Sequence, residues 1–295
     1  MMETYLTLVT GARGALGQLV CRDLAASPDV RLAAASRSPE KLVFPAEADV
    51  ELRRVDFDEP STLDQAFSGV RRALIISTDE LARPGHRQRQ HKAALEAALQ
   101  SGVHHVAYTS MPNPATSAAI PFAADHAAME EDLRDSGLQY SVLRNSWYQE
   151  NLLSYLPQIV RDGVWYTAAG AGRIAYVARE DAAAAAARAL TSDQGLGVVD
   201  VAGPAALTVD DIAALVSDAV GKSIRVVHVE QDRLIRELAR QGVAPQVILM
   251  VAMTEANQSS GHFDVPPDGT MALLGRTPKS LSRFFQEHAA ALARG

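Results

Sequence analysis

The sequence lacks several features that mark common protein classes. It has one cysteine, Cys21, among 295 residues, so no disulfide can form within the chain and a reducing, cytoplasmic environment is expected. Cys21 falls in a predicted helix, where a small packing residue is favoured over a reactive thiol. No apolar run approaches the roughly 18 residues that cross a membrane, and no basic segment followed by an apolar core marks a signal peptide.

Excess positive charge is absent as well. The formal net charge of −7 argues against a nucleic-acid partner or an anionic membrane surface. Hydrophobic residues make up 47% and charged residues 21%, which is typical of a soluble globular protein. A length of 295 residues allows one large α/β domain, or a main domain with a smaller partner.

The histidines show no spacing typical of metal ligands. His86 and His91 lie five residues apart on a predicted helix over 83–100, and that spacing does not bring two side chains to one face. Their neighbours are Arg87, Arg89 and Lys92. We interpret this stretch as a solvated basic helix face. His104 and His105 open a strand and point to opposite sides, so no metal site is expected.

A glycine-rich turn is the strongest pattern present. A β-branched, apolar run over 6–9 leads into Gly11, Gly14 and Gly17, and an apolar helix follows as far as Leu24. A strand, a tight turn and a helix in this order direct free N–H groups at a pyrophosphate. Gly11 permits the turn, Gly14 lets the backbone approach phosphate, and Gly17 lets the helix lie close to the strand. The alternative is an ordinary surface turn.

Arg37 indicates which dinucleotide is bound. A second predicted strand over 30–35 ends at Ser36 and Arg37, where an NAD site usually places an acid that binds the ribose hydroxyls. A cation there favours the 2′-phosphate of NADPH instead, and Arg13 in the glycine turn is a second cation within reach. The alternative is that Arg37 is a solvated surface residue.

Strands and helices alternate through the first half of the chain. The expected strands are 6–9, 30–35, 50–55, 72–77, 103–109 and 138–144, and further helices are expected at 60–67, 83–100, 122–135 and 181–190. This alternation predicts an α/β fold with a doubly wound parallel sheet, Rossmann-like, in the order 3-2-1-4-5-6. We assign 1–150, with a return at 175–205, to the dinucleotide-binding domain.

A smaller C-terminal α/β lobe is expected to comprise 151–174 and 206–295. Thr208 is predicted to cap a helix, a strand is expected at 224–229, helices at 232–256, and a last helix near Ser280.

Polar residues follow two predicted strands where ligands bind in doubly wound sheets. Ser77, Thr78 and Asp79 end the fourth strand, and the stretch 145–151 follows the sixth. That second stretch reads Asn-Ser-Trp-Tyr-Gln-Glu-Asn. Trp147 and Tyr148 could be ordinary core residues, but a patch this polar favours a ligand site.

Three motifs together resemble the NmrA-like family of atypical short-chain dehydrogenases. They are Val9 to Gly17, Ala107 to Ser110, and Leu143 to Asn151. Further similar stretches run to Leu273–Pro278, so the resemblance covers nearly the whole chain. The resemblance implies that NADPH is held by Gly11, Ala12, Arg13, Gly14, Ala15 and Leu16, by Arg37, by Ser77, Thr78 and Asp79, and by Asn145, Ser146, Trp147, Tyr148, Gln149 and Glu150.

The resemblance further implies hydride transfer from NADPH to a quinone without flavin. Ordinary short-chain dehydrogenases use Tyr-x-x-x-Lys, but the corresponding helix here carries His126 and Glu130, so their alcohol chemistry is not expected. Asn145 and Tyr148 are the candidates to orient the substrate or stabilise its oxyanion, and His126 is a weaker candidate proton donor. Two alternatives remain open: a reductase of another carbonyl, imine or enone, and an NADP(H)-binding redox sensor without catalysis.

Overall fold

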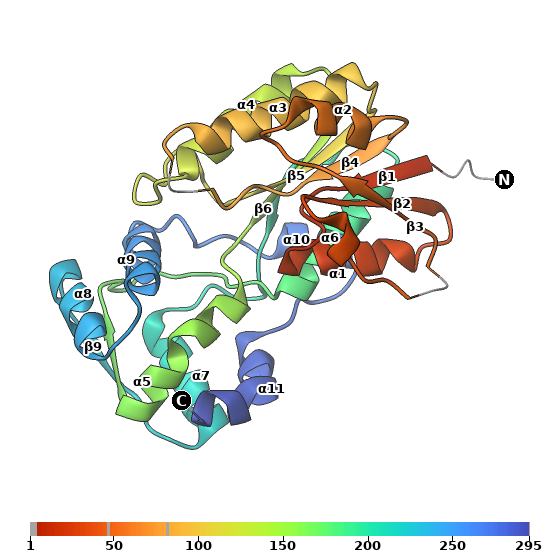
Figure 1. The fold of residues 1–295 in the computed structure, drawn as a ribbon. Coiled ribbons are helices and arrows are strands. Elements are labelled where there is room, and N and C mark those ends of the chain that lie inside the picture. Colours follow the sequence, from red (N-terminus) through yellow and green to blue (C-terminus); the bar gives the residue numbers. More distant parts are fainter. Residues whose placement is uncertain (1–4, 46–47, 81–82, 295) are drawn as a thin grey trace. The chain divides into compact units, whose positions relative to one another are not determined.

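The computed structural model describes residues 5–45, 48–80 and 83–294 (Figure 1). The strands are β1 Tyr5–Val9, β2 Val30–Ser36, β3 Val50–Arg54, β4 Arg72–Ile75, β5 His105–Ser110, β6 Gln139–Asn145, β7 Val164–Thr167, β8 Gly197–Val201 and β9 Arg225–His228. The helices are α1 Ala15–Ala25, α2 Pro60–Phe67, α3 His86–Gln100, α4 Ala123–Asp135, α5 Leu156–Asp162, α6 Arg179–Thr191, α7 Val209–Val220, α8 Gln231–Arg240, α9 Pro245–Ser259, α10 Asp268–Leu274 and α11 Leu281–Ala293, with short 3₁₀ segments η1 Pro39–Lys41 and η2 Gln149–Ser154.

The main sheet has the order β3-β2-β1-β4-β5-β6-β8, which confirms the predicted order and adds β8 at its end. The pairs from β3 through β6 are parallel. β8 also runs parallel to β6, since Leu196 N–H donates to Ser141 Oγ and Ser146 N–H donates to the carbonyl of Val201. The carboxyl ends of these strands therefore meet at one edge of the sheet.

Helices cover both faces of this sheet, as expected when parallel strands are joined by helical crossovers. Figure 1 shows α2, α3 and α4 on one face and α1 with α6 on the other. Ala73, Leu74 and Ile75 of β4 are each fully buried, which explains the continuous apolar run of that strand. Phe67 of α2 and Tyr108 of β5 belong to the same buried cluster under α2–α4.

The chain divides into two compact units. The first comprises 1–114, 124–144 and 179–199, and the second comprises 115–123, 145–178 and 200–295. In the second unit, β7 and β9 form a parallel pair that lies outside the main sheet. Within the described residues, no helix combines the length and apolarity that would let it cross a bilayer.

Two predicted helix starts in the second unit are confirmed. The Thr208 hydroxyl accepts from Asp211 N–H, and the Asp211 carboxylate accepts from Thr208 N–H, so a capping box begins α7. The Ser280 hydroxyl accepts from Arg283 N–H and caps α11.

Candidate functional site

The glycine turn connects β1 to α1 as predicted. Gly11 adopts φ +63°, and its carbonyl accepts from Gly14 N–H at 2.9 Å. A Cβ on Gly17 would lie 2.3 Å from the Gly11 carbonyl oxygen and 2.8 Å from Ala12 Cα. The first turn of α1 can therefore approach the preceding loop this closely only without a side chain at 17.

The start of α1 suits a phosphate group. Gly14 is the N-cap residue, and no side chain caps the helix. The N–H groups of the first turn therefore keep their capacity to donate to an anion. Arg13 is exposed beside them and adds a positive charge. The close glycine packing, the uncapped helix and the cation fit the pyrophosphate of a dinucleotide.

Arg37 directly follows β2 and is exposed. Two residues earlier, the Ala35 carbonyl accepts from Ala12 N–H at 3.0 Å, so the end of β2 is bonded to the glycine turn. Among the described residues, no hydrogen bond or ion pair to Arg37 is found, so its guanidinium has donors for a ligand phosphate. This position fits the phosphate-reading role expected from the sequence.

The loop after β4 is held by side chains. The strand was predicted to reach residue 77, but β4 ends at Ile75 because the next backbone amides leave the sheet. Ile76 N–H donates to Thr10 Oγ1, Ser77 N–H to Thr109 Oγ1 and Thr78 N–H to His91 Nε2, at 3.0, 2.9 and 3.1 Å. Three consecutive amides are thus satisfied within the protein.

Asn145 and Tyr148 lie at the end of β6 and in the turn after it. Asn145 Nδ2 donates to the Tyr148 hydroxyl oxygen at 3.1 Å. Within the described chain, Asn145 Oδ1 and Ser146 Oγ are buried without a hydrogen-bond partner. Buried polar atoms of this kind are uncommon and are often satisfied by a ligand or water.

The other residues of this stretch have identifiable packing partners. Trp147 is half-buried, stacks on Phe122 at 6.4 Å between ring centroids and contacts Phe263 at 5.0 Å. Gln149 is fully buried and donates through Nε2 to the backbone carbonyls of Tyr176 and Lys279. The Gln149 amide nitrogen therefore connects separate segments of the second unit.

His126 lies inside the first unit. Its Nε2 is 2.8 Å from Arg87 Nη2, and its Nδ1 is 2.8 Å from the Tyr108 hydroxyl. Burial lowers the pKa of His126 well below its usual range, and the Arg87 charge lowers it further. A neutral, doubly engaged imidazole does not favour the proton-donor role expected for His126.

Glu130, one helical turn further along α4, also has internal partners. Its carboxylate accepts from Ser110 Oγ at 2.6 Å and from Arg144 Nε and Nη2 at 3.0 and 2.6 Å. His126 and Glu130, which stand where Tyr and Lys were sought, are thus both hydrogen-bonded inside the protein.

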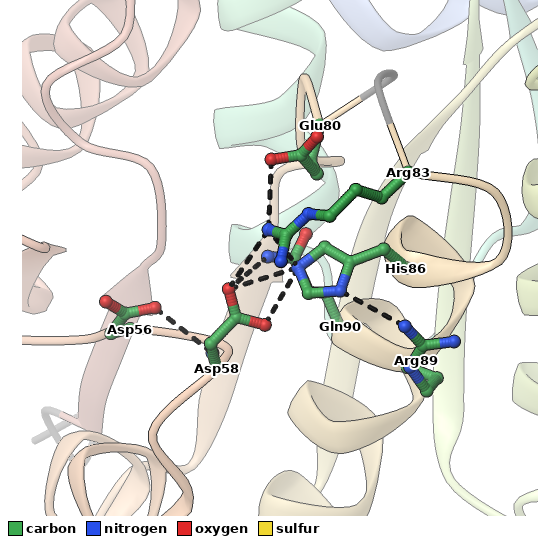
Figure 2. Close-up of polar contacts among 7 residues, drawn as sticks. All are labelled: Asp56, Asp58, Glu80, Arg83, His86, Arg89 and Gln90. Carbon is green, nitrogen blue, oxygen red and sulfur yellow. Dashed lines mark hydrogen bonds and ion pairs between the residues drawn. The ribbon is translucent and has the colours of Figure 1, made fainter.

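The prediction of a solvated basic face on α3 is confirmed for Arg89 and Lys92, which are exposed, but is wrong for the residues that point inward. His86, Arg87 and His91 are all buried in α3. His86 Nε2 lies 3.0 Å from Asp58 Oδ1, and Gln90 Nε2 donates to Asp58 Oδ2 at 3.1 Å, as Figure 2 shows. The carboxylate of the loop after β3 partners these groups, which helical spacing alone could not reveal.

Cys21 is fully buried in α1, as its packing interpretation predicted. Burial raises the pKa of the Cys21 thiol to about 12, so it stays protonated and unreactive at neutral pH. Within the described residues, no cluster of His, Cys, Asp and Glu is suited to hold a metal ion.

A small cavity of about 20 Å³, enough for a water molecule, lies within the second unit. Its lining combines aromatic, aliphatic and polar side chains: Trp147, Asn151, Leu152, Tyr155, Trp165, Tyr176, Val209, Ile212, Met250, Val251, Thr254, Glu255 and Gln258. Sequence reasoning did not single out Glu255. Its Oε2 accepts from Ala168 N–H at 2.6 Å, and burial raises its pKa to about 7.

Glu255 is expected to make stability depend on pH. A carboxyl whose pKa is raised from 4.5 to about 7 stabilises the fold below pH 4.5, and this contribution is lost as pH rises through 7. The loss is on the order of 3 kcal/mol, at about 1.4 kcal/mol per pKa unit. In urea unfolding between pH 4.5 and 8, the stability difference between wild type and Glu255→Gln should fall by that amount. A constant difference would contradict the shift.

Comparison with known proteins identifies a nucleotide-binding family, in agreement with the glycine turn and the parallel sheet. Residues 11–193 match the NAD(P)H-binding family. The chain belongs to this NAD(P)H-binding, NmrA-like family. It is 34% identical over 276 residues to quinone oxidoreductase 2 of Escherichia coli (strain K12), covering 93% of this chain and 95% of the relative.

Two solved structures of similar proteins contain the nucleotide. The NADPH complex of the Escherichia coli NADPH-dependent quinone oxidoreductase superposes with a TM-score of 0.87 at 32% identity, covering 95% of this chain and 99% of that one. The Citrobacter sp. triphenylmethane reductase complexed with NADP(H) gives 0.87 at 29% identity, covering 97% and 100%. This family member is accordingly an NAD(P)H-dependent oxidoreductase.

Proposed function

We propose that the protein reduces a quinone by direct hydride transfer from NADPH, without flavin. The observation that carries this proposal is the Asn145–Tyr148 pair, in which Asn145 at the end of β6 donates to the Tyr148 hydroxyl oxygen. The similarity to quinone oxidoreductase 2 over nearly the whole chain supports a quinone as acceptor. The backbone of Gly11 to Gly17 is proposed to bind the pyrophosphate of NADPH. The loop Ser77 to Asp79 is proposed to contact another part of the cofactor.

Quinone reduction does not require a strong general acid from the protein. When bound, NADPH supplies a hydride, which adds two electrons to the quinone while the nicotinamide is oxidised. One carbonyl oxygen of the quinone then carries a phenolate-like charge, whose conjugate acid has a pKa near that of tyrosine, about 10. Hydrogen-bond donation by the Tyr148 hydroxyl stabilises that oxygen, and Asn145 orients the hydroxyl. Water can supply the final proton.

Turnover with added quinone tests this function. Purified protein should oxidise NADPH only when a simple quinone is present, and stereospecifically deuterated NADPH should give a primary isotope effect in single-turnover mixing where hydride transfer limits the step. The protein should be colourless, whereas a bound flavin would absorb near ~450 nm and would make flavin the electron carrier. If NADPH binds but no quinone accelerates its oxidation, the redox-sensor alternative is favoured.

Arg37 is expected to set the preference for NADPH. Arg37→Ala should weaken NADPH binding by about 1–3 kcal/mol, because a charge-assisted hydrogen bond to the 2′-phosphate is lost, while NADH binding stays nearly constant. Fluorescence titration with both nucleotides measures the two affinities. Arg31→Ala, at the opposite end of β2 and also exposed, is the matched control. Equal weakening of NADPH and NADH would rule out Arg37 as the residue that reads the phosphate.

A further inference from the structure

A closed circuit of hydrogen bonds begins and ends at the peptide groups of Thr78. The Thr78 carbonyl accepts from Arg87 Nε at 2.6 Å, and Arg87 Nη2 lies 2.8 Å from His126 Nε2. His126 Nδ1 lies 2.8 Å from the Tyr108 hydroxyl, which lies 3.3 Å from His91 Nδ1. His91 Nε2 accepts from Thr78 N–H and closes the circuit.

The chemistry of the donors assigns the imidazole protons in this circuit. A guanidinium only donates, so His126 Nε2 must accept from Arg87. A backbone N–H also only donates, so His91 Nε2 must accept from Thr78. Each neutral imidazole then carries its hydrogen on Nδ1, and both Nδ1–H groups are directed at the Tyr108 oxygen. The phenol therefore joins the two histidines.

Burial and charge support this assignment. The exposed fractions are 4% for Arg87, 1% for His91, 4% for His126 and 0% for Tyr108. Burial lowers the pKa of His91 to about 3, with the Arg87 charge contributing, so both imidazoles remain neutral. Arg87 Nη1 lies 3.6 Å from Asp125 Oδ2, and this ion pair balances the buried charge.

The circuit is bonded to a short segment at the carboxyl edge of the sheet. Thr78 lies three residues beyond the end of β4, in the loop Ser77–Asp79. Helix α3 supplies Arg87 and His91 to this loop, while Gln90 of the same helix donates to Asp58 in the loop after β3 (Figure 2). The amino-terminal half of α3 thus holds two loops at the edge where this fold binds ligands.

A core position alone does not require these residues. Apolar side chains of similar size would fill the space under α3 and α4 without the desolvation of an arginine and two imidazoles. The polar circuit differs from apolar packing because it forms hydrogen bonds to both the N–H and the C=O of Thr78. These bonds fix the orientation of the backbone at that residue. Buried hydrogen-bond networks can specify one local conformation in this way.

We infer that Arg87, His91, Tyr108 and His126 are positioning residues that hold the loop Ser77–Asp79 in the conformation that binds NADPH. This inference rests on the proposed function in assigning that loop to the cofactor. None of the four side chains needs to touch the nucleotide, because they act through the backbone of Thr78.

Tyr108→Phe tests the inference with little change of packing, since only the hydroxyl between the two histidines is removed. Amide exchange of residues 76–78 in the nucleotide-free protein should become about tenfold faster as local opening grows easier. The midpoint of an NADPH fluorescence titration should rise about five- to tenfold. At saturating NADPH and quinone, kcat should stay within about twofold. Arg87→Lys, which keeps the charge but not the forked donors, should behave similarly.

Tyr140→Phe is the control. It also removes a tyrosine hydroxyl from the first unit, but near the amino end of β6, away from the carboxyl edge of the sheet. Unchanged exchange at 76–78 in Tyr108→Phe would overturn the circuit as a restraint on the loop. Faster exchange with an unchanged NADPH midpoint would overturn its role in cofactor binding, as would a loss of titration amplitude at constant midpoint. Normal NADPH binding by the wild type without quinone turnover would instead overturn the proposed acceptor and leave this inference standing.

Discussion

Tyr148→Phe is expected to lower kcat for NADPH-dependent quinone reduction by roughly tenfold to a thousandfold, the range for removing one oxyanion donor. The Tyr148 hydroxyl oxygen accepts from Asn145 Nδ2, and we expect the phenol to donate its hydrogen to the quinone oxygen as charge develops there. Because the phenyl ring remains, packing around the turn after β6 should persist. NADPH affinity should be nearly unchanged.

Steady-state kinetics at saturating NADPH, together with a fluorescence titration of the nucleotide, separates these effects. Tyr140→Phe makes the same chemical change near the amino end of β6 and should leave kcat unaffected. If quinones are reduced and Tyr148→Phe matches wild type, direct hydride transfer stands and the hydroxyl has no part in stabilising the oxyanion. Asn145→Ala should give an intermediate loss, since the hydroxyl then remains but loses the donor that orients it.

Gly17→Ala is expected to weaken NADPH binding by about a hundredfold or more. The added Cβ would meet the Gly11 carbonyl oxygen at 2.3 Å and Ala12 Cα at 2.8 Å, so turn and helix must move apart. Because the contacted atoms belong to the backbone, no side chain can rotate to relieve the clash. Two misaligned charge-assisted bonds to the pyrophosphate, each worth roughly 1.5–3 kcal/mol, account for the size of the effect.

Titration of NADPH, combined with urea unfolding, distinguishes a binding defect from general destabilisation. Gly102→Ala is a control in the same unit, since Gly102 has φ +71° and space for a Cβ. That change should lower stability by about 1 kcal/mol through backbone strain and leave the NADPH midpoint unchanged. Wild-type NADPH affinity in Gly17→Ala would show that the glycine turn does not hold the cofactor.

Much of the first unit followed from local patterns. Apolar runs such as 73–75 could be recognised as parts of buried parallel strands, and proline marked where a helix such as α2 begins. The order of the first six strands could be predicted because right-handed crossovers leave few topologies. The Gly11 to Gly17 turn could be located, and Arg37 proposed to bind the 2′-phosphate, because both inferences depend on spacing along one short segment.

The second unit was harder to anticipate. β7 was not predicted, although it pairs in parallel with β9. It is a four-residue strand with a single partner, and so short a segment carries little periodicity of its own. The helices α5 and α10, seven residues each, were missed for the same reason. The later helices were located only as one region over 232–256, which Gly242 and Pro245 divide into α8 and α9.

The sequence by itself determined the fold class and the cofactor class, because each depends on residues close together in the chain. Only the tertiary structure decided the roles of Arg87, His91 and His126, which looked like surface charge or a proton donor. The physical reason is that burial and hydrogen-bond partners arise from distant segments: Arg87 and His126 are separated by 39 residues, yet their side chains meet at 2.8 Å. Helical spacing describes one element, whereas the partners of a polar side chain are supplied by the elements packed against it.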